Sequence, residues 1–260
     1  KRTNMNRPTL IHNIGSLVTN GPLVEKNHWS NPSIEDLGII QNAWLLVDQG
    51  KIIDFGPRDT QPLSLGTTLR IDAEQRCILP GLIDCHTHPL FAGSRSHEFC
   101  ARVDGKTYQQ IAAAGGGIMS TVRQTRSAAD DHLLNLAAAR LMNMKSWGVT
   151  CLEVKSGYGL SYEQELRHLK LLNELKTKIP QTLSITCLAL HAYAGEHQSQ
   201  AHYIEEMTTK LLPEVAKLKL ADSVDAFVEK GYFEPHQIHS HMKKARDLGL
   251  NVRIHADEFK

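Results

Sequence analysis

The first part of the chain carries a β-type pattern of apolar and polar positions. Within residues 1–76, short runs rich in β-branched and apolar residues are separated by turn formers, which is typical of strands. The tripeptide Asp48-Gln49-Gly50 lies between two such runs and predicts a hairpin with glycine in the left-handed conformation. We expect residues 1–76 to form a small β-sandwich domain, or one half of one, as the first part of a composite domain.

From residue 77 onward, strand-like runs alternate with segments in which apolar residues repeat every 3.6 positions. The strand-like runs cover residues 78–84, 149–155, 183–190, 223–229 and 251–255, and the helical segments cover 131–148, 161–178, 202–218 and 235–249. Such alternation predicts βα units around a parallel sheet. We therefore expect an α/β fold, namely a TIM-like (β/α)8 barrel, with a doubly wound sheet as the alternative.

The number of strands raises a question of completeness. Residues 77–260 contain five strand-like runs, whereas a full barrel has eight strands and usually about 250 residues. The chain also stops at RIHADEFK, directly after the fifth run and without a following helix. We expect the sequence to hold the first five strands of a barrel and to be the front portion of a longer protein.

Composition and charge exclude several classes of protein. Lys and Arg number 29 against 28 Asp and Glu, and no long run carries one sign, which argues against a dedicated nucleic-acid binder. No window approaches the roughly 18 consecutive apolar residues of a membrane span, and the N-terminus lacks the apolar core of a signal peptide. The five cysteines form no CxxC pair and are odd in number, so we expect no disulfide framework and a cytoplasmic location. A homodimer is left open.

A pair of histidines marks the end of the first strand-like run of the barrel. His86 and His88 lie in PGLIDCHTHPLFAGSR, and residues two apart on a strand point to the same side. One strand can thus supply two imidazoles to one metal, and barrel active sites lie at the carboxyl ends of strands. The 14 histidines of the chain form one other such pair, His239 and His241. Helical spacing sends those two rings to different faces, and we interpret them as solvated helix surface.

His255 ends the fifth strand-like run, at the same edge of the expected sheet. A single histidine there more often makes a structural hydrogen bond, but together with His86 and His88 it favours a metal site that would activate water. No convincing carboxylate ligand precedes the end of the sequence. Glu258, in HADEF, is either a loop carboxylate in water or an acid/base beside metal-bound water.

Three further residues are candidates for substrate contacts. Arg95 lies in the loop AGSRSHEF, where a planar guanidinium could bind a substrate carboxylate through two hydrogen bonds. Tyr158 stands between two glycines in VKSGYGL, which permit a tight loop that directs the ring inward. His191 ends the third strand-like run and fits the same face.

Two other features are interpreted as structural. Lys155 could be mistaken for a metal-bridging lysine, but we assign it a structural role. The run Gly115-Gly116-Gly117 matches neither GxxxxGK[ST] nor GxGxxG, so it predicts a flexible turn before a helix rather than a phosphate loop.

With these residues identified, the sequence resembles the imidazolonepropionases, amidohydrolase-superfamily enzymes of histidine degradation. The resemblance runs through nearly the whole chain. Its specific segments are PGLIDCHTHPLFAGSRSHEF, TYQQIAAAGGGIMSTVRQTR, EVKSGYGL, LALHA and RIHADEF. The His-Thr-His sequence at 86–88 by itself indicates only an amidohydrolase, whereas the whole set of segments is specific to this family.

The resemblance implies an amidohydrolase-type barrel that uses one metal ion, zinc or iron, to hydrolyse the cyclic amide of 4-imidazolone-5-propanoate to N-formimidoyl-L-glutamate. The substrate is then a small molecule with a carboxylate. Position by position, the resemblance assigns the metal to His86, His88 and His255, and the substrate to Arg95, Tyr158, His191 and Glu258. In this scheme Arg95 binds the propionate carboxylate, Glu258 is the catalytic carboxylate, and Tyr108 is a further candidate for the site wall.

The chain departs from the family in its length. Relatives continue well beyond residue 260, where the resemblance places an Asp that completes the metal shell and a further catalytic His. Two other interpretations stay open. One is another cyclic amidohydrolase or a nucleobase deaminase, since these enzymes share the His-Thr-His sequence and a strand-end histidine. The other is an inactive fragment with a binding or regulatory role. Arg95 discriminates against the deaminase, because a pocket for a neutral base has no need of a carboxylate clamp.

Overall fold

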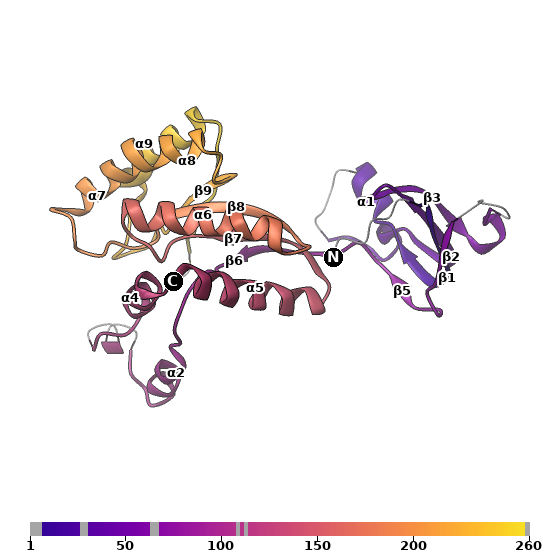
Figure 1. Cartoon of the computed structure of the whole chain (residues 1–260), viewed down its shortest axis with the longest axis horizontal. Coiled ribbons are helices and arrows are strands. Elements are labelled where there is room, and N and C mark those ends of the chain that lie inside the picture. Colours follow the sequence, from indigo (N-terminus) through magenta and orange to yellow (C-terminus); the bar gives the residue numbers. More distant parts are fainter. Residues whose placement is uncertain (1–6, 27–30, 63–67, 108–109, 112–113, 258–260) are drawn as a thin grey trace. The chain divides into compact units, whose positions relative to one another are not determined.

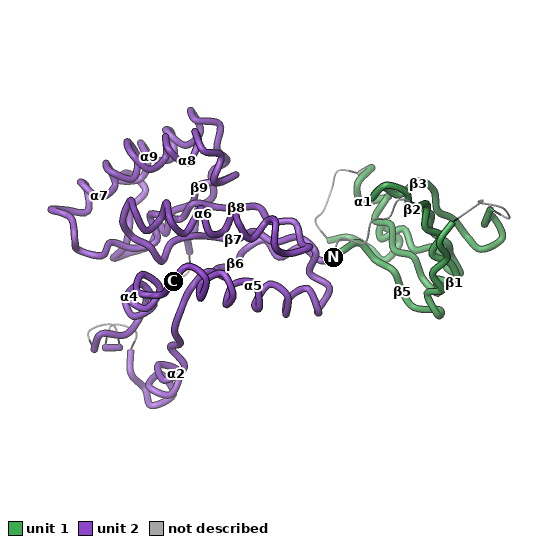
Figure 2. Tube along the Cα trace, viewed as in Figure 1, with its two compact units in different colours: residues 1–81 green, residues 82–260 purple. Residues whose placement is uncertain are grey.

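The computed structural model describes residues 7–26, 31–62, 68–107, 110–111 and 114–257. The chain divides into two compact units, Lys1–Gly81 and Leu82–Lys260, here called unit 1 and unit 2 (Figure 2). Unit 1 is built on a mixed sheet, and unit 2 consists of βα units (Figure 1).

Unit 1 contains one five-stranded sheet in the order β3-β2-β1-β4, with β5 also beside β1. Its strands are β1 (Thr9–Val18), β2 (Ile39–Asp48), β3 (Lys51–Pro57), β4 (Leu69–Asp72) and β5 (Cys77–Ile78), and its short helices are α1 (Gly21–Lys26), η1 (Glu35–Leu37) and η2 (Arg58–Thr60). The first three strands are antiparallel neighbours, while β4 and β5 run parallel to β1. The described residues show one sheet, so a second layer that would make a sandwich stays a prediction.

The hairpin of unit 1 forms where the sequence predicts it. Gln49 and Gly50 connect β2 to β3 and both have positive φ, 47° and 76°. Two successive residues with positive φ are characteristic of the tight turns whose twist matches that of paired strands. The sequence expectation is therefore met at this turn.

The boundary between the units lies later than the sequence suggested. Cys77 and Ile78 pair with Ser16 and Leu17 of β1, so they belong to the sheet of unit 1 rather than to the first strand of the barrel. The Pro-Gly dipeptide at 80–81 separates this short strand from the next one, because proline cannot donate a ladder hydrogen bond. The division falls after residue 81 instead of after residue 76.

Unit 2 contains five parallel strands in the order β6-β7-β8-β9-β10, which is also their order along the chain. They are β6 (Leu82–Thr87), β7 (Val149–Lys155), β8 (Thr182–Leu190), β9 (Ser223–Ala226) and β10 (Asn251–Val252). The helices are α2 (Ser96–Val103), α4 (Ile118–Ser127), α5 (Asp130–Ser146), α6 (Tyr162–Lys178), α7 (Gln200–Glu206), the π-helical turn η3 (Met207–Leu211), α8 (Leu212–Lys217) and α9 (Pro235–Asp247). The α/β class is confirmed.

The core of unit 2 lies between the sheet and the helices that cover it. Leu141 of α5 and Leu172 of α6 are fully buried in one cluster with Leu152 of β7 and Ile185 of β8. Burial of each such side chain contributes roughly 1.5–3 kcal/mol. The 3.6-residue apolar period of the sequence thus becomes the contact face of each helix.

The predicted helix at 202–218 contains a local irregularity. It is continuous through α7 and α8, but η3 between them is a π-helical turn. Pro213, the second residue of α8, has no N–H to donate, which removes one regular hydrogen bond from the ladder. The widened turn lies where that bond is missing.

Candidate metal and substrate site

Three histidines from distant parts of the sequence come together at one end of the parallel sheet. His86 is in β6, His88 follows the end of that strand, and His255 forms an isolated bridge with Phe227 beyond β9. Potential ligand atoms of the three side chains lie within 4.8 Å of one another. The Nε2 atoms of His86 and His88 are 3.4 Å apart. In the part of the chain that the structure describes, no other group of three metal-binding side chains is this close.

The three-histidine group is suited to a cation because two of its imidazoles, those of His86 and His88, have lowered pKa values. Burial, together with the neighbouring histidines, lowers the pKa of His88 to about 2, and burial also lowers the pKa of His86. A neutral imidazole offers a nitrogen lone pair, which is the form that ligates zinc or iron. His88 Nδ1 is also buried without a hydrogen-bond partner.

A buried aspartate lies behind His255. Asp225 of β9 places Oδ2 2.8 Å from His255 Nδ1 and accepts a hydrogen bond of 2.8 Å from Lys155 Nζ. Burial would raise the pKa of Asp225, but its contacts with His255 and Lys155 outweigh that effect and lower the pKa to about 2. A carboxylate on one ring nitrogen fixes the orientation of a histidine and leaves the other nitrogen for a ligand. The sequence analysis missed Asp225; an acidic residue inside an apolar strand run was the available signal.

Lys155 belongs to a buried ion-pair network rather than to the three-histidine group. Its Nζ also contacts Glu153 Oε1 on the same strand, and both side chains are at most 3% exposed. Thr186 of β8 donates to the same Glu153 oxygen, and Arg253 Nε lies 3.5 Å from it. Paired charges of this kind are tolerated in a core because each satisfies the other. The network agrees with a structural role for Lys155.

His191 and Tyr158 form an aromatic wall beside His88. The His191 ring stacks on that of His88 with centroids 5.2 Å apart, and the Tyr158 ring lies 5.9 Å from His88 and 5.4 Å from His191. Burial lowers the pKa of His191 to about 4, and its Nδ1 lies 2.9 Å from the carbonyl oxygen of Gly157. In the neutral ring Nδ1 then donates to that carbonyl, and Nε2 carries the lone pair.

Arg95 and Tyr158 line one cavity of about 470 Å³. Its other lining residues are Phe91, Gly93, Ser94, Thr121 and Arg140. The Arg95 side chain is 39% exposed, with its guanidinium 3.9 Å from Glu98 Oε2. A cation available to solvent in a cavity with an aromatic wall can receive a small anionic ligand.

Arg140 was not singled out from the sequence. Its Nη1 donates to the carbonyl oxygens of Pro89 and Phe91, each at 2.7 Å, and its guanidinium lies 3.6 Å from the centre of the Phe91 ring. These contacts hold the turn that follows His88. An arginine within a helical pattern offers no signal of such a role until the loop it contacts is known.

The glycine run acts as a turn, in agreement with the sequence analysis. Gly117 has φ +67° and directly precedes α4, and its N–H donates to Glu98 Oε1 at 2.8 Å. Because Glu98 also pairs with Arg95, the run is linked to the cavity through one carboxylate.

The interpretation of the second histidine pair was wrong for one member. His239 is exposed on α9, but His241 is completely buried, with Nδ1 2.8 Å from Thr208 Oγ1. Burial lowers the pKa of His241 to about 4. Helical spacing does separate the two rings, but the face that carries His241 is covered by η3.

Two of the predicted site residues, Tyr108 and Glu258, lie outside the described residues, and their roles stay predictions. The described residues add no carboxylate to the three-histidine group.

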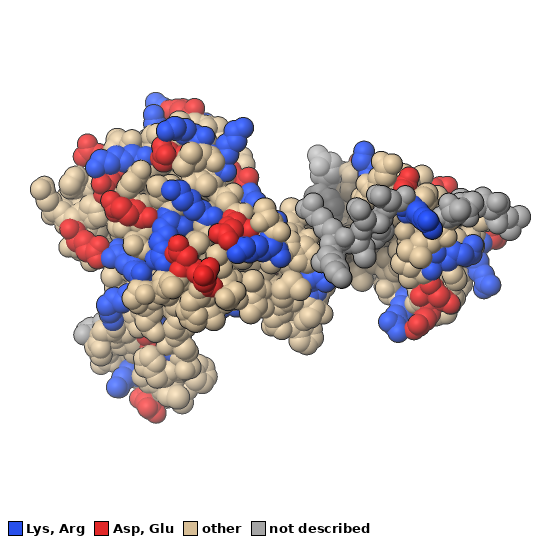
Figure 3. Space-filling view, in the orientation of Figure 1, with Lys and Arg blue, Asp and Glu red and all other residues tan. Residues whose placement is uncertain are grey.

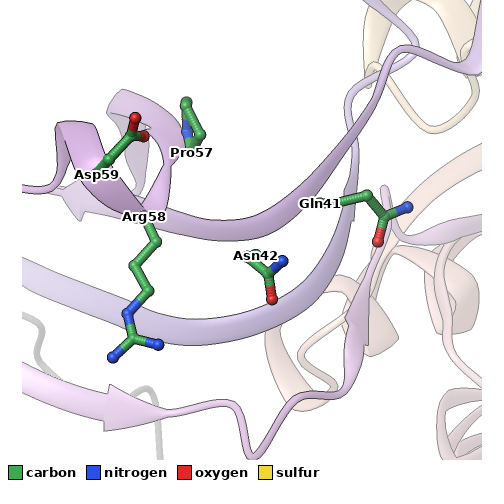
Figure 4. Close-up of a pocket in the computed structure, with 5 residues that line it drawn as sticks. All are labelled: Gln41, Asn42, Pro57, Arg58 and Asp59. Carbon is green, nitrogen blue, oxygen red and sulfur yellow. The ribbon is translucent and has the colours of Figure 1, made fainter.

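Other cavities of the described surface contain none of the predicted site residues; one of about 640 Å³ is lined by residues of α9 and β10, among them Lys243 and Arg246. A cavity of about 520 Å³ in unit 1 is lined by Gln41, Asn42, Pro57, Arg58 and Asp59, none of which was a candidate (Figure 4). Basic and acidic side chains are interspersed over the face of unit 2 in Figure 3. Among the helices that the structure describes, none is long and apolar enough to cross a bilayer.

Comparison with known sequences supports the resemblance seen in the motifs. The chain is 40% identical over 239 residues to imidazolonepropionase of Acinetobacter baumannii (strain ACICU), covering 90% of this chain and 60% of that protein. It is 44% identical over 222 residues to imidazolonepropionase of Pseudomonas aeruginosa (strain UCBPP-PA14), covering 85% of this chain and 55% of that protein. The chain therefore spans between half and two thirds of the length of these relatives, and its sequence relationship to the imidazolonepropionases is confirmed. No family model matches the chain.

Comparison with solved structures shows the fold. The 5-methylcytosine deaminase of Klebsiella pneumoniae, liganded with phosphonocytosine, matches 96% of this chain and 52% of its own, with a TM-score of 0.64 and 16% identity. An atrazine chlorohydrolase mutant of Arthrobacter aurescens, complexed with zinc and atraton, matches 95% of this chain and 52% of its own, with a TM-score of 0.53 and 15% identity. The chain thus shares its α/β fold with the matching parts of these enzymes.

Proposed function

We propose that this relative of the imidazolonepropionases hydrolyses the cyclic amide of 4-imidazolone-5-propanoate to N-formimidoyl-L-glutamate, a step of histidine degradation. The sequence relationship supports the reaction, and one observation in the structure carries it to particular residues. The three-histidine group lies beside an aromatic wall whose Tyr158 also lines the cavity that contains Arg95. A site for a cation and a site for an anion are therefore contiguous, as an anionic substrate of a metal-dependent hydrolase requires.

We assign the cation site to one metal ion, zinc or iron, held by His86, His88 and His255. Imidazole suits both metals, so the ligand set does not choose between them. When bound, the metal would polarise the ring carbonyl and lower the pKa of a water molecule towards neutrality. Asp225 holds His255 from behind, and the lowered pKa values of His86 and His88 keep those rings in the ligating form.

We assign the substrate to the cavity lined by Arg95 and Tyr158, beside the three-histidine group. Arg95 would bind the propionate carboxylate, and the rings of Tyr158 and His191 would flank the imidazolone ring. Ring opening adds the oxygen of water to the carbonyl carbon and breaks the adjacent C–N bond, so the leaving nitrogen takes up a proton. We assign that proton transfer to Glu258, which follows His255 closely in the sequence.

The remaining assignments concern context. We propose that the parallel sheet is part of an eight-stranded barrel and that the sheet of unit 1 is one layer of a two-layer domain. We also propose a cytoplasmic location and, as partner, a small-molecule substrate with a carboxylate, without nucleic acid or membrane. The five free cysteines support a reducing compartment. Whether two copies associate as a homodimer is a separate proposal that equilibrium sedimentation would test.

The test is turnover with three substrates under identical conditions. Purified protein supplied with Zn²⁺ or Fe²⁺ should consume 4-imidazolone-5-propanoate, with N-formimidoyl-L-glutamate as the product by mass spectrometry. Cytosine and guanine should not release ammonia. Release of ammonia from either base without imidazolone turnover would favour the deaminase, and absence of all three activities would favour an inactive chain.

A further inference from the structure

We propose that Glu165 is a positioning residue of the substrate site: its buried carboxylate holds the loop of residues 156–160 in the conformation that presents Tyr158. The consequence for substrate binding rests on the proposed function, whereas the hydrogen bonding of Glu165 to the loop does not. Glu165 lies in the first turn of α6 and is completely buried.

Both oxygens of Glu165 accept hydrogen bonds from the backbone of this loop. Oε1 accepts from the N–H of Gly159 at 2.7 Å and of Leu160 at 2.9 Å, and Oε2 accepts from the N–H of Gly157 at 3.1 Å. The side chain of Ser156 also helps to lower the pKa of the carboxylate. The donors lie on both sides of Tyr158, so one side chain determines the backbone path through that residue.

The glycines of the loop fit closely around this carboxylate. A Cβ atom at Gly159 would lie 2.7 Å from Glu165 Oε1 and 2.6 Å from the backbone nitrogen of Glu165. Gly157 has φ +113°, and a Cβ there would lie 2.9 Å from the Leu188 carbonyl oxygen and 3.0 Å from His191 Nδ1. Side chains at either position would displace the neighbours that the loop now contacts. The two glycines and Glu165 therefore form a matched set.

The same loop also fixes the orientation of the His191 ring. The carbonyl oxygen of Gly157 lies 2.9 Å from His191 Nδ1, while the N–H of Gly157 is held by Glu165. Tyr158, the next residue, contacts the rings of His88 and His191. A shift of the loop would thus move the Tyr158 ring and the hydrogen-bond partner of His191 together.

Burying the Glu165 carboxylate is energetically unfavourable unless hydrogen bonds from the loop offset the loss of hydration. Glu165 stands on the apolar face of α6, with the fully buried Leu169 and Leu172 four and seven residues later. Burial raises the pKa of Glu165, and the hydrogen bonds from the loop oppose that rise. An apolar residue there would continue the helix face but leave three backbone N–H groups without this acceptor.

Glu165→Gln tests the inference because it keeps the size of the side chain and replaces one acceptor oxygen by an NH2 donor. The probe is imidazole-4-propanoate, which has the ring and carboxylate of the proposed substrate but no carbonyl to hydrolyse, titrated calorimetrically into zinc-supplied protein. We expect its Kd to rise roughly 10- to 100-fold with the zinc content unchanged. Hydrogen exchange at residues 156–160 should accelerate about tenfold or more.

His168→Gln is the matched control. His168 lies on the same helix, is completely buried, and has no hydrogen-bond partner for either ring nitrogen. The variant alters a buried polar group of α6 without touching the loop, so exchange at residues 156–160 and probe affinity should both stay near wild type. If it reproduced both effects, general loosening of α6 would explain them, and the positioning role would be overturned.

A double-mutant cycle separates positioning from a merely structural role. If Glu165 acts through Tyr158, Glu165→Gln should have little further effect on Kd in a Tyr158→Ala background. Additive losses, or an unchanged Kd in Glu165→Gln, would overturn the inference. If wild-type protein does not bind the probe, the proposed function fails. Hydrogen exchange at residues 156–160 then still tests whether Glu165 holds the loop. Unchanged exchange in Glu165→Gln would overturn that part of the inference.

Discussion

Within the described residues, unit 1 and unit 2 each have a sheet of five strands, but they bury those strands differently. In unit 1, Leu45 of β2 is 7% exposed, whereas Ile52 and Phe55 of the neighbouring β3 are 63% and 43% exposed. In unit 2, the inner strand β8 is buried from Ile185 to its end, whereas the edge strand β6 leaves Leu82 and Ile83 49% and 71% exposed. Parallel strands with helices over them lie deeper than the strands of an antiparallel sheet with one open face. Side chains at their carboxyl ends can therefore be withdrawn from water.

The second difference lies in what each unit buries. Within the described part of unit 1, the one buried polar residue is Thr9. Unit 2 buries charged and titratable side chains with specific partners, among them Glu153, Lys155, Glu165 and Asp225. Burying an unpaired charge costs free energy, so buried charged groups are found where they pair with and orient neighbouring groups. The comparison teaches that the chemistry of this chain depends on unit 2, and substitutions can test that.

The largest effect is expected from loss of a metal ligand in unit 2. His88→Ala should lower metal affinity more than roughly 100-fold and abolish turnover, because two imidazoles cannot replace three. His239→Ala, on the exposed surface of α9, is the control and should retain metal. Metal per chain is measured by elemental analysis after dialysis, and stoichiometric metal in His88→Ala would refute the ligand assignment.

Next comes the anion site. Arg95→Ala should raise KM about 10- to 150-fold, the equivalent of roughly 1.5–3 kcal/mol for a charge-assisted contact. Its metal content should not change, since Arg95 belongs to the cavity rather than to the three-histidine group. Arg102→Ala, on the exposed surface of α2, controls for general charge effects. Steady-state kinetics decide, and an unchanged KM would show that the carboxylate binds elsewhere.

Substitution of Asp225, the buried partner of His255, should have a slightly smaller effect. Asp225→Asn keeps the shape but removes the charge that orients the ring, so metal affinity should fall roughly 10- to 100-fold. Glu153→Gln is the matched control, because it disturbs the same buried network without touching His255. Competition with a chelator measures the affinity. Equal losses in the two variants would mean that the network acts only through stability.

The last prediction concerns acid stability rather than ligand binding. Burial lowers the pKa of His168 and of His241 to about 4 from the ordinary value of 6.5, so the folded state binds fewer protons than the unfolded state between these values. The contribution of these two histidines to stability should therefore be constant above pH 6.5 and fall as the pH drops towards 4, by roughly 1–3 kcal/mol for each histidine.

Urea unfolding at pH 7.5 and at pH 5 would measure this loss. His168→Leu should reduce the pH dependence, because His168 has no hydrogen-bond partner to lose. Unit 1 has no buried histidine among its described residues, so its transition should hardly move over the same range. An equal response of both units would contradict the contrast between them.

Much of the fold was predictable because local periodicity reports burial. The helix expected at 161–178 is α6, Tyr162–Lys178, where Ser161 caps the first turn by accepting from the Gln164 N–H. The strand expected at 149–155 is β7 with the same bounds. Errors occurred where local pattern is ambiguous: residues 77–78 join unit 1 because pairing with β1, rather than their apolar character, decides which sheet they enter.

The candidate site divides in the same way. Histidine at positions 86, 88 and 255, arginine at 95 and tyrosine at 158 carry recognisable motifs, since each occupies a strand end or a glycine-flanked loop. Asp225, Arg140 and Glu165 carry none, because each acts through a partner far away in the sequence. Their roles depend on which strand, loop or helix end lies opposite.

The linear order of residues therefore specified the types of element, the alternation of strand and helix, and the chemical groups available at strand ends. Folding specified which of those groups meet. Burial is a property of a position in the packed molecule, which is why His241 is buried while His239 on the same helix is exposed. The pKa of a histidine and the partner of a carboxylate follow from that packing, because both depend on the solvent and charges around the group rather than on its neighbours in the chain.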